Sequence, residues 1–141
     1  HIHTKSEKQK ITVIQPDDLL LAKMDARLIV QVLINLLDNA IKYTPSDSQI
    51  TITAKRNGET VCVSVADNGN GIEGEQKLRV FDMFYTGANK IVDSRRSIGL
   101  GLSLCKSIIN AHGGEITITD NVPHGAIFTF TLPVGEVGFH E

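Results

Sequence analysis

Residues Val30–Thr44 read VQVLINLLDNAIKYT, and the rest of the chain is organised around this stretch. At about 100° per residue its apolar side chains fall on one broad stripe, which predicts an amphipathic helix that faces a core. The stripe consists of Ile29, Leu33, Leu36, Leu37 and Ala40. Asp25 is placed to cap the start of the helix, and Pro45 directly after Thr44 ends it.

A second set of side chains on the same helix does not belong to this stripe. Asn35, Asn39 and Lys42 are spaced i, i+4 and i+7, so they stack on a separate polar ridge with Tyr43 at its edge. Carboxamide oxygens are hard ligands and an ammonium group neutralises phosphate charge, so the ridge suits a magnesium-bound polyphosphate. A solvated helix face explains the same residues, and on this stretch alone it is the simpler interpretation.

The composition bounds the class of protein. The chain has 141 residues, 41% of them hydrophobic, which suits one domain with one core. A net charge of −2 gives no general reason to bind nucleic acid or an anionic membrane. The sequence contains neither an apolar run of about 18 residues nor a signal peptide, so we expect a soluble polypeptide in the cytoplasm, either on its own or as the cytoplasmic part of a membrane-bound protein. Cys62 and Cys105 lie in apolar patterns without metal-ligand spacing and are expected to be buried and reduced.

The alternation of apolar and polar residues predicts five strands around two main helices. The strands are expected at Lys10–Ile14, Ile50–Lys55, Val61–Ala66, Ile116–Thr119 and Ile127–Leu132. Asn57-Gly58 predicts a two-residue hairpin between the second and third strands, and Leu102–Ala111 predicts the second helix. This order predicts an α+β fold, a two-layer α/β sandwich whose mixed, largely antiparallel sheet is covered on one face by helices.

Glycine-rich segments flank the predicted elements at two places. Asp67–Ile72 reads DNGNGI after a strand, where glycines let the backbone turn and a flat ligand approach, although an ordinary turn explains it equally well. Gly99-Leu100-Gly101 opens the second helix, whose free N–H groups form a potential anion site. The long segment between them, 73–98, contains Phe81 and Phe84 and is interpreted as a hinged lid, against the alternative of a solvated loop.

Four stretches now stand in a fixed order: NLLDNAIKYT, DNGNGI, FDMF and GLGL. This set resembles the N, G1, F and G2 boxes of sensor histidine kinase catalytic domains, in the ATPase superfamily shared with type II topoisomerases, mismatch-repair ATPases and heat-shock chaperones. The resemblance covers Asp25–Pro133, including His112-Gly113-Gly114 and the FTFTLP strand. It implies an ATP-binding catalytic domain at residues 10–133, with a lid at about 73–98, a flexible end at 1–9 and a tail at 134–141.

Carried over by position, the resemblance implies a role for each polar residue. Asn39 would bind the Mg²⁺ that bridges the ATP phosphates, Asn35 would support the same site, and Lys42 and Tyr43 would lie along the phosphates and ribose. Asp67 would accept a hydrogen bond from the adenine amino group, as a carboxylate favours adenine over guanine at that edge. The other implied nucleotide-binding residues are Gly69, Gly71, Ile72, Phe81, Phe84, Lys90, Gly99, Leu100, Gly101 and Leu102.

The lid departs from the usual pattern of the family. Ser97 stands where a further glycine is common, and Met83 and Thr86 stand where many members carry basic residues around the F box. Lys90, Arg95 or Arg96 could supply the missing charge, and the sequence leaves that choice open. Gly87-Ala88-Asn89-Lys90 resembles the potassium-responsive Kdp sensor kinases.

Asn35 also bears on the reaction. Superfamily members that hydrolyse ATP place a glutamate base one turn before the metal-binding asparagine, and an amide cannot take a proton. The resemblance therefore implies phosphoryl transfer by positioning and charge neutralisation, with a histidine as acceptor. No histidine here has a phosphoacceptor pattern, and His112 is expected to be a structural cap. We therefore expect a catalytic fragment that cannot autophosphorylate alone.

The implied partners are ATP, a phosphoacceptor domain outside this chain and a response regulator, with no nucleic acid and no direct membrane contact. Two alternatives stay open in the same superfamily: an anti-sigma-type serine kinase and a non-catalytic nucleotide-binding regulatory module.

Overall fold

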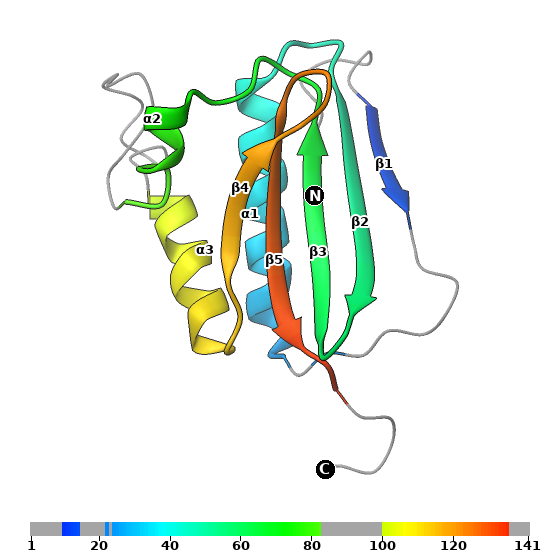
Figure 1. Ribbon diagram of the computed structural model, residues 1–141, viewed down its shortest axis with the longest axis vertical. Coiled ribbons are helices and arrows are strands. Elements are labelled where there is room, and N and C mark those ends of the chain that lie inside the picture. The colour runs from blue at the N-terminus through cyan, green and yellow to red at the C-terminus, as the bar shows by residue number, and fades with distance from the viewer. Residues whose placement is uncertain (1–9, 15–21, 23, 83–99, 136–141) are drawn as a thin grey trace.

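The computed structural model describes residues 10–14, 22, 24–82 and 100–135. In these residues five strands form a single sheet, which is accompanied by three helices (Figure 1). The elements are β1 (Lys10–Ile14), α1 (Ala26–Tyr43), β2 (Gln49–Asn57), β3 (Thr60–Asp67), α2 (Gly74–Lys77), α3 (Leu100–Ala111), β4 (Ile116–Asp120) and β5 (Ala126–Pro133). No helix in this described part of the chain is long and apolar enough to cross a membrane.

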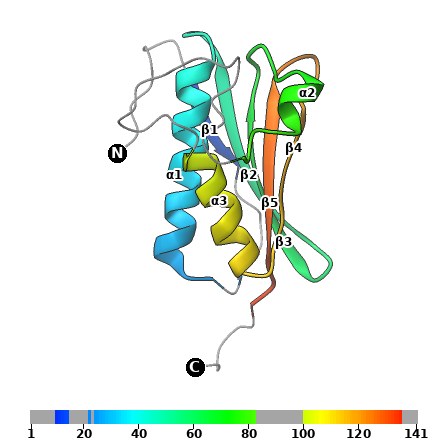
Figure 2. The same ribbon diagram turned by 90° about the vertical axis from the view of Figure 1, so that its left-hand side faces the viewer.

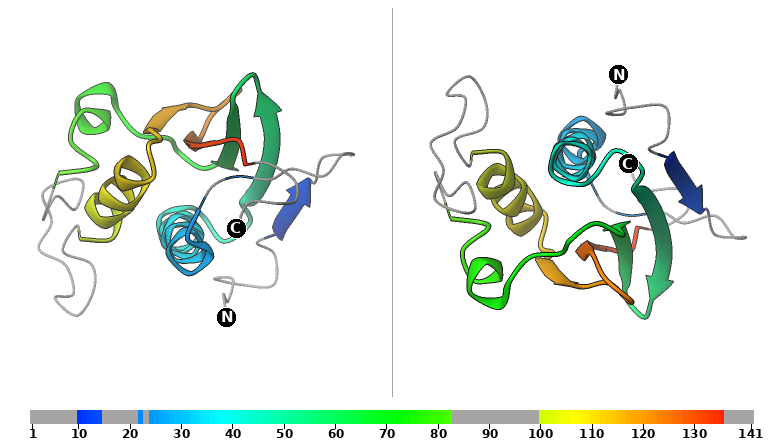
Figure 3. Two further views of the ribbon diagram at one scale, coloured as in Figure 1. Left: turned by 90° about the horizontal axis from the view of Figure 1, so that it is seen from below. Right: turned by 90° about the horizontal axis from the view of Figure 1, so that it is seen from above.

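The sheet has the strand order β1-β2-β3-β5-β4. β1 pairs with β2 in parallel, with α1 as the connection between them, and every other neighbouring pair is antiparallel. α1 and α3 lie side by side on the same face of the sheet (Figures 2 and 3). The predicted two-layer α/β sandwich with a mixed sheet is therefore confirmed.

The core lies between the two long helices and the middle strands. Its centre is formed by residues with 0% exposure on α1, α3 and β5: Val32, Leu36, Cys105, Ile109 and Phe130. The predicted stripe on α1 holds except at Leu33, which is only half-buried, while Val32 lies at the centre. α1 packs against both the sheet and α3, so it buries a wider arc than one stripe predicts.

The two ends of α1 are set by the residues that the sequence predicted, Asp25 and Pro45. Asp25 Oδ1 accepts a hydrogen bond from the Arg27 backbone N–H at 3.0 Å, as expected of an N-cap. The helix ends at Tyr43, and Thr44 takes an extended conformation before Pro45. The polar ridge therefore ends where the chain turns toward β2.

The β2–β3 hairpin turns one residue later than the Asn57-Gly58 signal predicted. Asn57 pairs with Thr60, so the two residues of the turn are Gly58 and Glu59. Gly58 has a φ of 66°, the left-handed region that favours glycine. Thr60 Oγ1 donates to the Asn57 carbonyl at 2.9 Å, which holds Asn57 within the strand pair.

His112 joins the end of α3 to the start of α1. Its Nε2 accepts a hydrogen bond from the Asp25 backbone N–H at 3.0 Å, so the proton is on Nδ1, which donates to the Ile108 carbonyl at 2.8 Å. Gly113 follows with a φ of 82° and ends the helix. These contacts agree with the structural role expected of His112.

Gly114 provides a test of the packing between α3 and the sheet. An ideal Cβ at this position would lie 1.8 Å from the Thr131 carbonyl oxygen, so we expect Gly114→Ala to force a backbone shift. Overpacking of this kind lowers the free energy of unfolding by about 3 kcal/mol. Urea denaturation measures the loss, with Gly74→Ala as the matched control because a Cβ at Gly74 would meet nothing within 4 Å. Equal urea midpoints for the two variants would contradict the packing described.

Candidate functional site

The carboxylate of Asp67 is fixed at the end of β3. The residue is only 8% exposed, and its Oδ1 accepts hydrogen bonds from the backbone N–H groups of Gly69 at 2.9 Å and Ala126 at 3.3 Å. Its second oxygen, Oδ2, accepts no hydrogen bond from the described residues. Two donors on one oxygen set the orientation of the group and leave the other oxygen able to accept from a ligand.

The loop that follows β3, residues 67–71 (the Asp67 loop), packs against the end of α1. Thr44 is buried, and its Oγ1 donates to the Ala40 carbonyl at 2.7 Å. A Cβ at Gly69 would lie 2.7 Å from the methyl carbon of Thr44, so only glycine fits at this position without a shift. The Asp67 loop and the polar ridge of α1, which are far apart in sequence, are therefore neighbours at one end of the molecule.

Gly71 has a backbone conformation that favours glycine, with a φ of 80°. A Cβ there would lie 3.2 Å from the Gly125 carbonyl oxygen. Gly69 and Gly71 were predicted to let a flat ligand approach the backbone closely. In the structure the close neighbours of these two glycines are Thr44 and Gly125 of the chain itself.

Asn35 lies where the polar ridge meets the first turn of α3. It is half-buried, and a Cβ at Gly101 would be 4.0 Å from its side-chain Cγ. On α3, one turn after Gly101, the Cys105 Sγ donates to the Val32 carbonyl of α1 at 3.8 Å. Burial raises the pKa of Cys105 to about 11, so its thiol is neutral at pH 7. The burial of this residue, at 0% exposure, agrees with the prediction.

The other cysteine differs from the prediction. Both cysteines are free, but Cys62 is only half-buried. It lies on β3 next to Val61, which is buried, and alternate residues of a strand point to opposite faces of the sheet. Cys62 therefore points to the face of the sheet that α1 and α3 do not cover, and this face stays partly exposed.

The remaining members of the ridge, Asn39 and Lys42, are half-buried on α1. The Lys42 ammonium lies 3.4 Å from a carboxylate oxygen of Asp38, one turn earlier on the helix. Asp38 was not among the predicted site residues, although its i, i+4 spacing from Lys42 indicates an ion pair on the helix surface. The ion pair orients the Lys42 ammonium on the polar ridge.

The first aromatic residue of the FDMF stretch is anchored to the sheet. Phe81 packs edge-to-face on Phe128 of β5, with ring centroids 6.1 Å apart and an interplanar angle of 89°. Ile72 and Leu102 also pack, half-buried, against the core. Lys77 of α2 pairs with Asp120 at the end of β4, Nζ to Oδ1 at 2.6 Å. The start of the predicted lid is therefore attached to the domain.

For several predicted site residues the structure describes neither the position nor the side chain. Phe84, Lys90 and Gly99 lie outside the described residues, as do Arg95 and Arg96 and most of the predicted lid. Tyr43 and Leu100 belong to described helices, but their side chains are not described. The roles assigned to these residues stay predictions.

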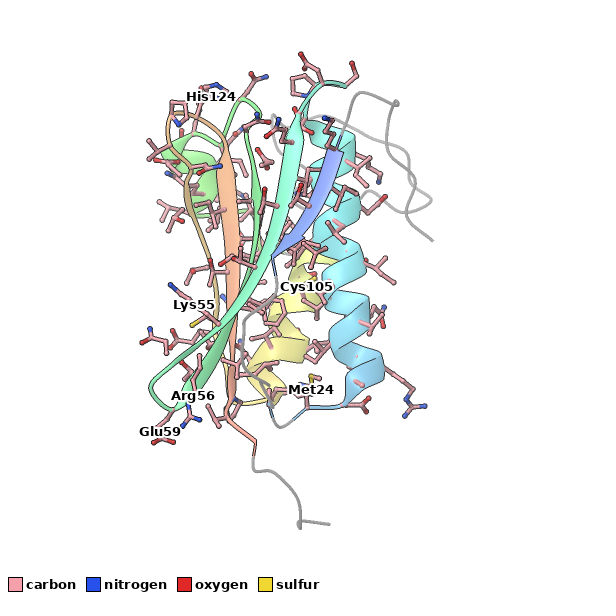
Figure 4. The ribbon with its side chains drawn as sticks, turned by 90° about the vertical axis from the view of Figure 1, so that its right-hand side faces the viewer. Met24, Lys55, Arg56, Glu59, Cys105 and His124 are labelled. Carbon is pink, nitrogen blue, oxygen red and sulfur yellow. The ribbon has the colours of Figure 1, made fainter. Side chains whose placement is uncertain are left out.

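The β4–β5 loop reaches the Asp67 loop and was missed by sequence reasoning. Asn121 Nδ2 donates to the Asp67 carbonyl at 2.7 Å, and His124 Nδ1 donates to the Gly69 carbonyl at 2.9 Å. His124 is at the end of the sheet opposite the β2–β3 turn that carries Glu59 (Figure 4). The sequence predicts the strands on either side of residues 120–125, but no local pattern indicates which distant segment a hairpin loop contacts.

Comparison with known proteins agrees with the four-box resemblance. Residues 24–136 match the family described as histidine kinase-, DNA gyrase B-, and HSP90-like ATPase. Sensor protein KdpD of Clostridium acetobutylicum is 45% identical over 129 residues, which make up 92% of this chain and 14% of that protein. The chain therefore spans only a small part of this relative.

Solved structures show the same likeness. The nucleotide-free catalytic domain of histidine kinase ThkA has 34% identity and a TM-score of 0.76, over 89% of this chain and 79% of that one. ThkA in complex with the response regulator protein TrrA has 33% identity and a TM-score of 0.73, over 91% of this chain and 35% of that one.

Proposed function

The chain belongs to the histidine kinase-, DNA gyrase B- and HSP90-like ATPase family, and we propose that it is the ATP-binding catalytic domain of a two-component sensor histidine kinase. It transfers the γ-phosphate of ATP to a histidine on a dimerisation and phosphoacceptor domain outside this chain. The contact between Thr44 and Gly69 carries this proposal. It sets the Asp67 carboxylate beside the helix of Asn39 and Lys42, so one nucleotide can meet both.

Asp67 selects the base in this proposal. Its oxygen Oδ2, which has no partner among the described residues, accepts a hydrogen bond from the adenine amino group. Guanine presents a carbonyl acceptor at the equivalent edge, which repels a carboxylate. We therefore expect ATP to bind more tightly than GTP.

In this proposal the polar ridge of α1 would bind the phosphates together with Mg²⁺. In the described part of the chain no group of three His, Cys, Asp or Glu side chains could hold a metal. Mg²⁺ at nucleotide sites takes most of its ligands from phosphate and water and needs only one or two protein oxygens, so the half-buried amide of Asn39 fits. When bound, the metal neutralises phosphate charge. Asn39 would hold it, and the Lys42 ammonium would add a further positive charge beside the phosphates.

Asn35 supports transfer rather than hydrolysis. Its side chain is an amide, half-buried on α1, and an amide cannot act as general base toward water. Water therefore stays a poor nucleophile at this site, and the phosphoryl group is kept for an acceptor brought by another domain. On this view the isolated chain does not phosphorylate itself.

The similarity to KdpD supports a parent protein of the Kdp sensor kinase type, and the ThkA complex supports a response regulator as the partner of that parent. We place the domain in the cytoplasm, where ATP is supplied. The net charge of −2 gives it no general affinity for nucleic acid.

Two measurements test the proposal. Calorimetric titration should show tighter binding of Mg-ATP than of Mg-GTP. When the phosphoacceptor hairpin of the parent kinase is added with γ-labelled ATP, acid-labile phosphate should appear on the hairpin, and the chain alone should remain unlabelled. Acid-stable phosphoserine on another protein would instead identify an anti-sigma-type kinase, and tight binding without transfer would identify a regulatory module.

A further inference from the structure

The β4–β5 loop, residues 121–125, makes several contacts with the loop that carries Asp67. Asn121 Nδ2 donates to the Asp67 carbonyl and His124 Nδ1 to the Gly69 carbonyl, at 2.7 and 2.9 Å. The Ala126 N–H, directly after the loop, donates to Asp67 Oδ1 at 3.3 Å. The two loops also approach closely, since a Cβ at Gly125 would lie 2.0 Å from the Asp67 carbonyl oxygen.

The side chain of Asn121 is held in one orientation. Its Oδ1 accepts from the Val122 N–H at 2.8 Å, so the NH₂ group is the one that faces Asp67. The Asn121 backbone N–H also donates to the Gly125 carbonyl at 3.0 Å, which closes the loop on itself. The β4–β5 loop is therefore a preformed unit with its donors directed at the Asp67 loop.

The two acceptors lie just past the paired part of the sheet. The register of β3 with β5 ends at Ala66 and Ile127, so the carbonyls of Asp67 and Gly69 do not have β5 as a regular partner. Backbone acceptors of this kind need a donor, and here it comes from side chains. Because a carbonyl oxygen only accepts, Nδ1 of His124 carries the proton.

The Asp67 loop needs an external support. Gly69 and Gly71 give its backbone more conformational freedom than other residues allow, and freezing that freedom on binding lowers affinity. On one side Thr44 of α1 packs against Gly69. On the other side Asn121 and His124 hold the carbonyls that flank Asn68, so the loop is clamped in one shape before any ligand arrives.

We propose that Asn121 and His124 are positioning residues: they hold the Asp67–Gly71 loop in its base-binding shape and so set the affinity and selectivity for adenine. This inference rests on the proposed function, because it assumes that Asp67 meets the base. Neither residue touches the phosphates in this proposal. Their loss should therefore weaken binding without slowing transfer once the site is full.

The experiment compares Asn121→Ala, His124→Ala and the double variant in the full chain, with Val122→Ala as the control. Val122 belongs to the same loop and is 87% exposed. Each single variant should bind Mg-ATP about 3- to 10-fold more weakly, as expected for one lost hydrogen bond, and the ATP-to-GTP preference should fall. The rate of transfer to the phosphoacceptor hairpin at saturating ATP should be unchanged. His124→Gln, which restores a donor, should recover part of the affinity.

The outcomes separate the two proposals. Wild-type chain that binds neither Mg-ATP nor Mg-GTP would overturn the proposed function. Wild-type chain that binds ATP, with Asn121→Ala and His124→Ala equal to Val122→Ala, would overturn only the positioning role. A loss of affinity that follows a loss of thermal stability in every variant, without recovery in His124→Gln, would also overturn it, because it would indicate general loosening of the fold.

Discussion

Asp67→Asn should weaken the binding of ATP by at least about 100-fold, equivalent to about 3 kcal/mol, with the fold left in place. Asparagine keeps an oxygen that can accept from Gly69 and Ala126, as Oδ1 does now. The other position becomes an NH₂ group, which faces the adenine amino group donor to donor. The loss therefore combines a missing charge-assisted hydrogen bond with a new repulsion.

The structure shows why alanine is the less informative substitution at this position. Asp67→Ala also removes the acceptor for two backbone N–H groups in a buried loop, so weaker binding could reflect a displaced loop rather than a lost contact. Calorimetry with Mg-ATP and Mg-GTP measures the effect of Asp67→Asn. Asn70→Ala, an exposed residue of the same loop, is the control. Wild-type affinity in Asp67→Asn would contradict the assignment of the adenine contact.

Elements with a strong local signal were predicted correctly. The stripe on α1, its Asp25 cap and the Pro45 stop located an 18-residue helix, because these features depend only on neighbours along the chain. The β2–β3 turn was placed one residue early, since pairing of Asn57 with Thr60 depends on the partner strand. Likewise Val32 became central only because α3 packs beside α1.

Many residues of the candidate site could be named from the sequence, but the contacts between them could not. The four boxes named residues on α1, after β3 and at the start of α3, and the structure brings Thr44 against Gly69 and Asn35 near Gly101. Asn121 and His124 had no signal, because their importance comes from the pairing of β3 with β5, which are separated by some sixty residues in sequence. Contacts across a sheet are fixed by register, and register is a property of the whole fold.

Asn39→Ala should lower the rate of phosphoryl transfer by about 100-fold, the loss typical of removing one group that stabilises charge in the transition state. Asn39 is half-buried on the polar ridge, one turn after Asn35 and one turn before Lys42. It can offer Mg²⁺ one amide oxygen, and alanine offers none. The rate is measured with the phosphoacceptor hairpin and γ-labelled ATP. Gln31→Ala, exposed two turns earlier on α1, is the matched control for helix effects.

The metal dependence of affinity distinguishes a ligand role for Asn39 from a packing role. If Asn39 binds Mg²⁺, then Asn39→Ala loses ATP affinity in the presence of Mg²⁺ but not in the presence of EDTA, and Asn39→Asp, which keeps an oxygen, retains part of the Mg²⁺ dependence. If Asn39 only packs, the affinity falls equally under both conditions. An equal loss, or an unchanged transfer rate, would therefore remove Asn39 from the metal site and leave Lys42 as the main countercharge to the phosphates.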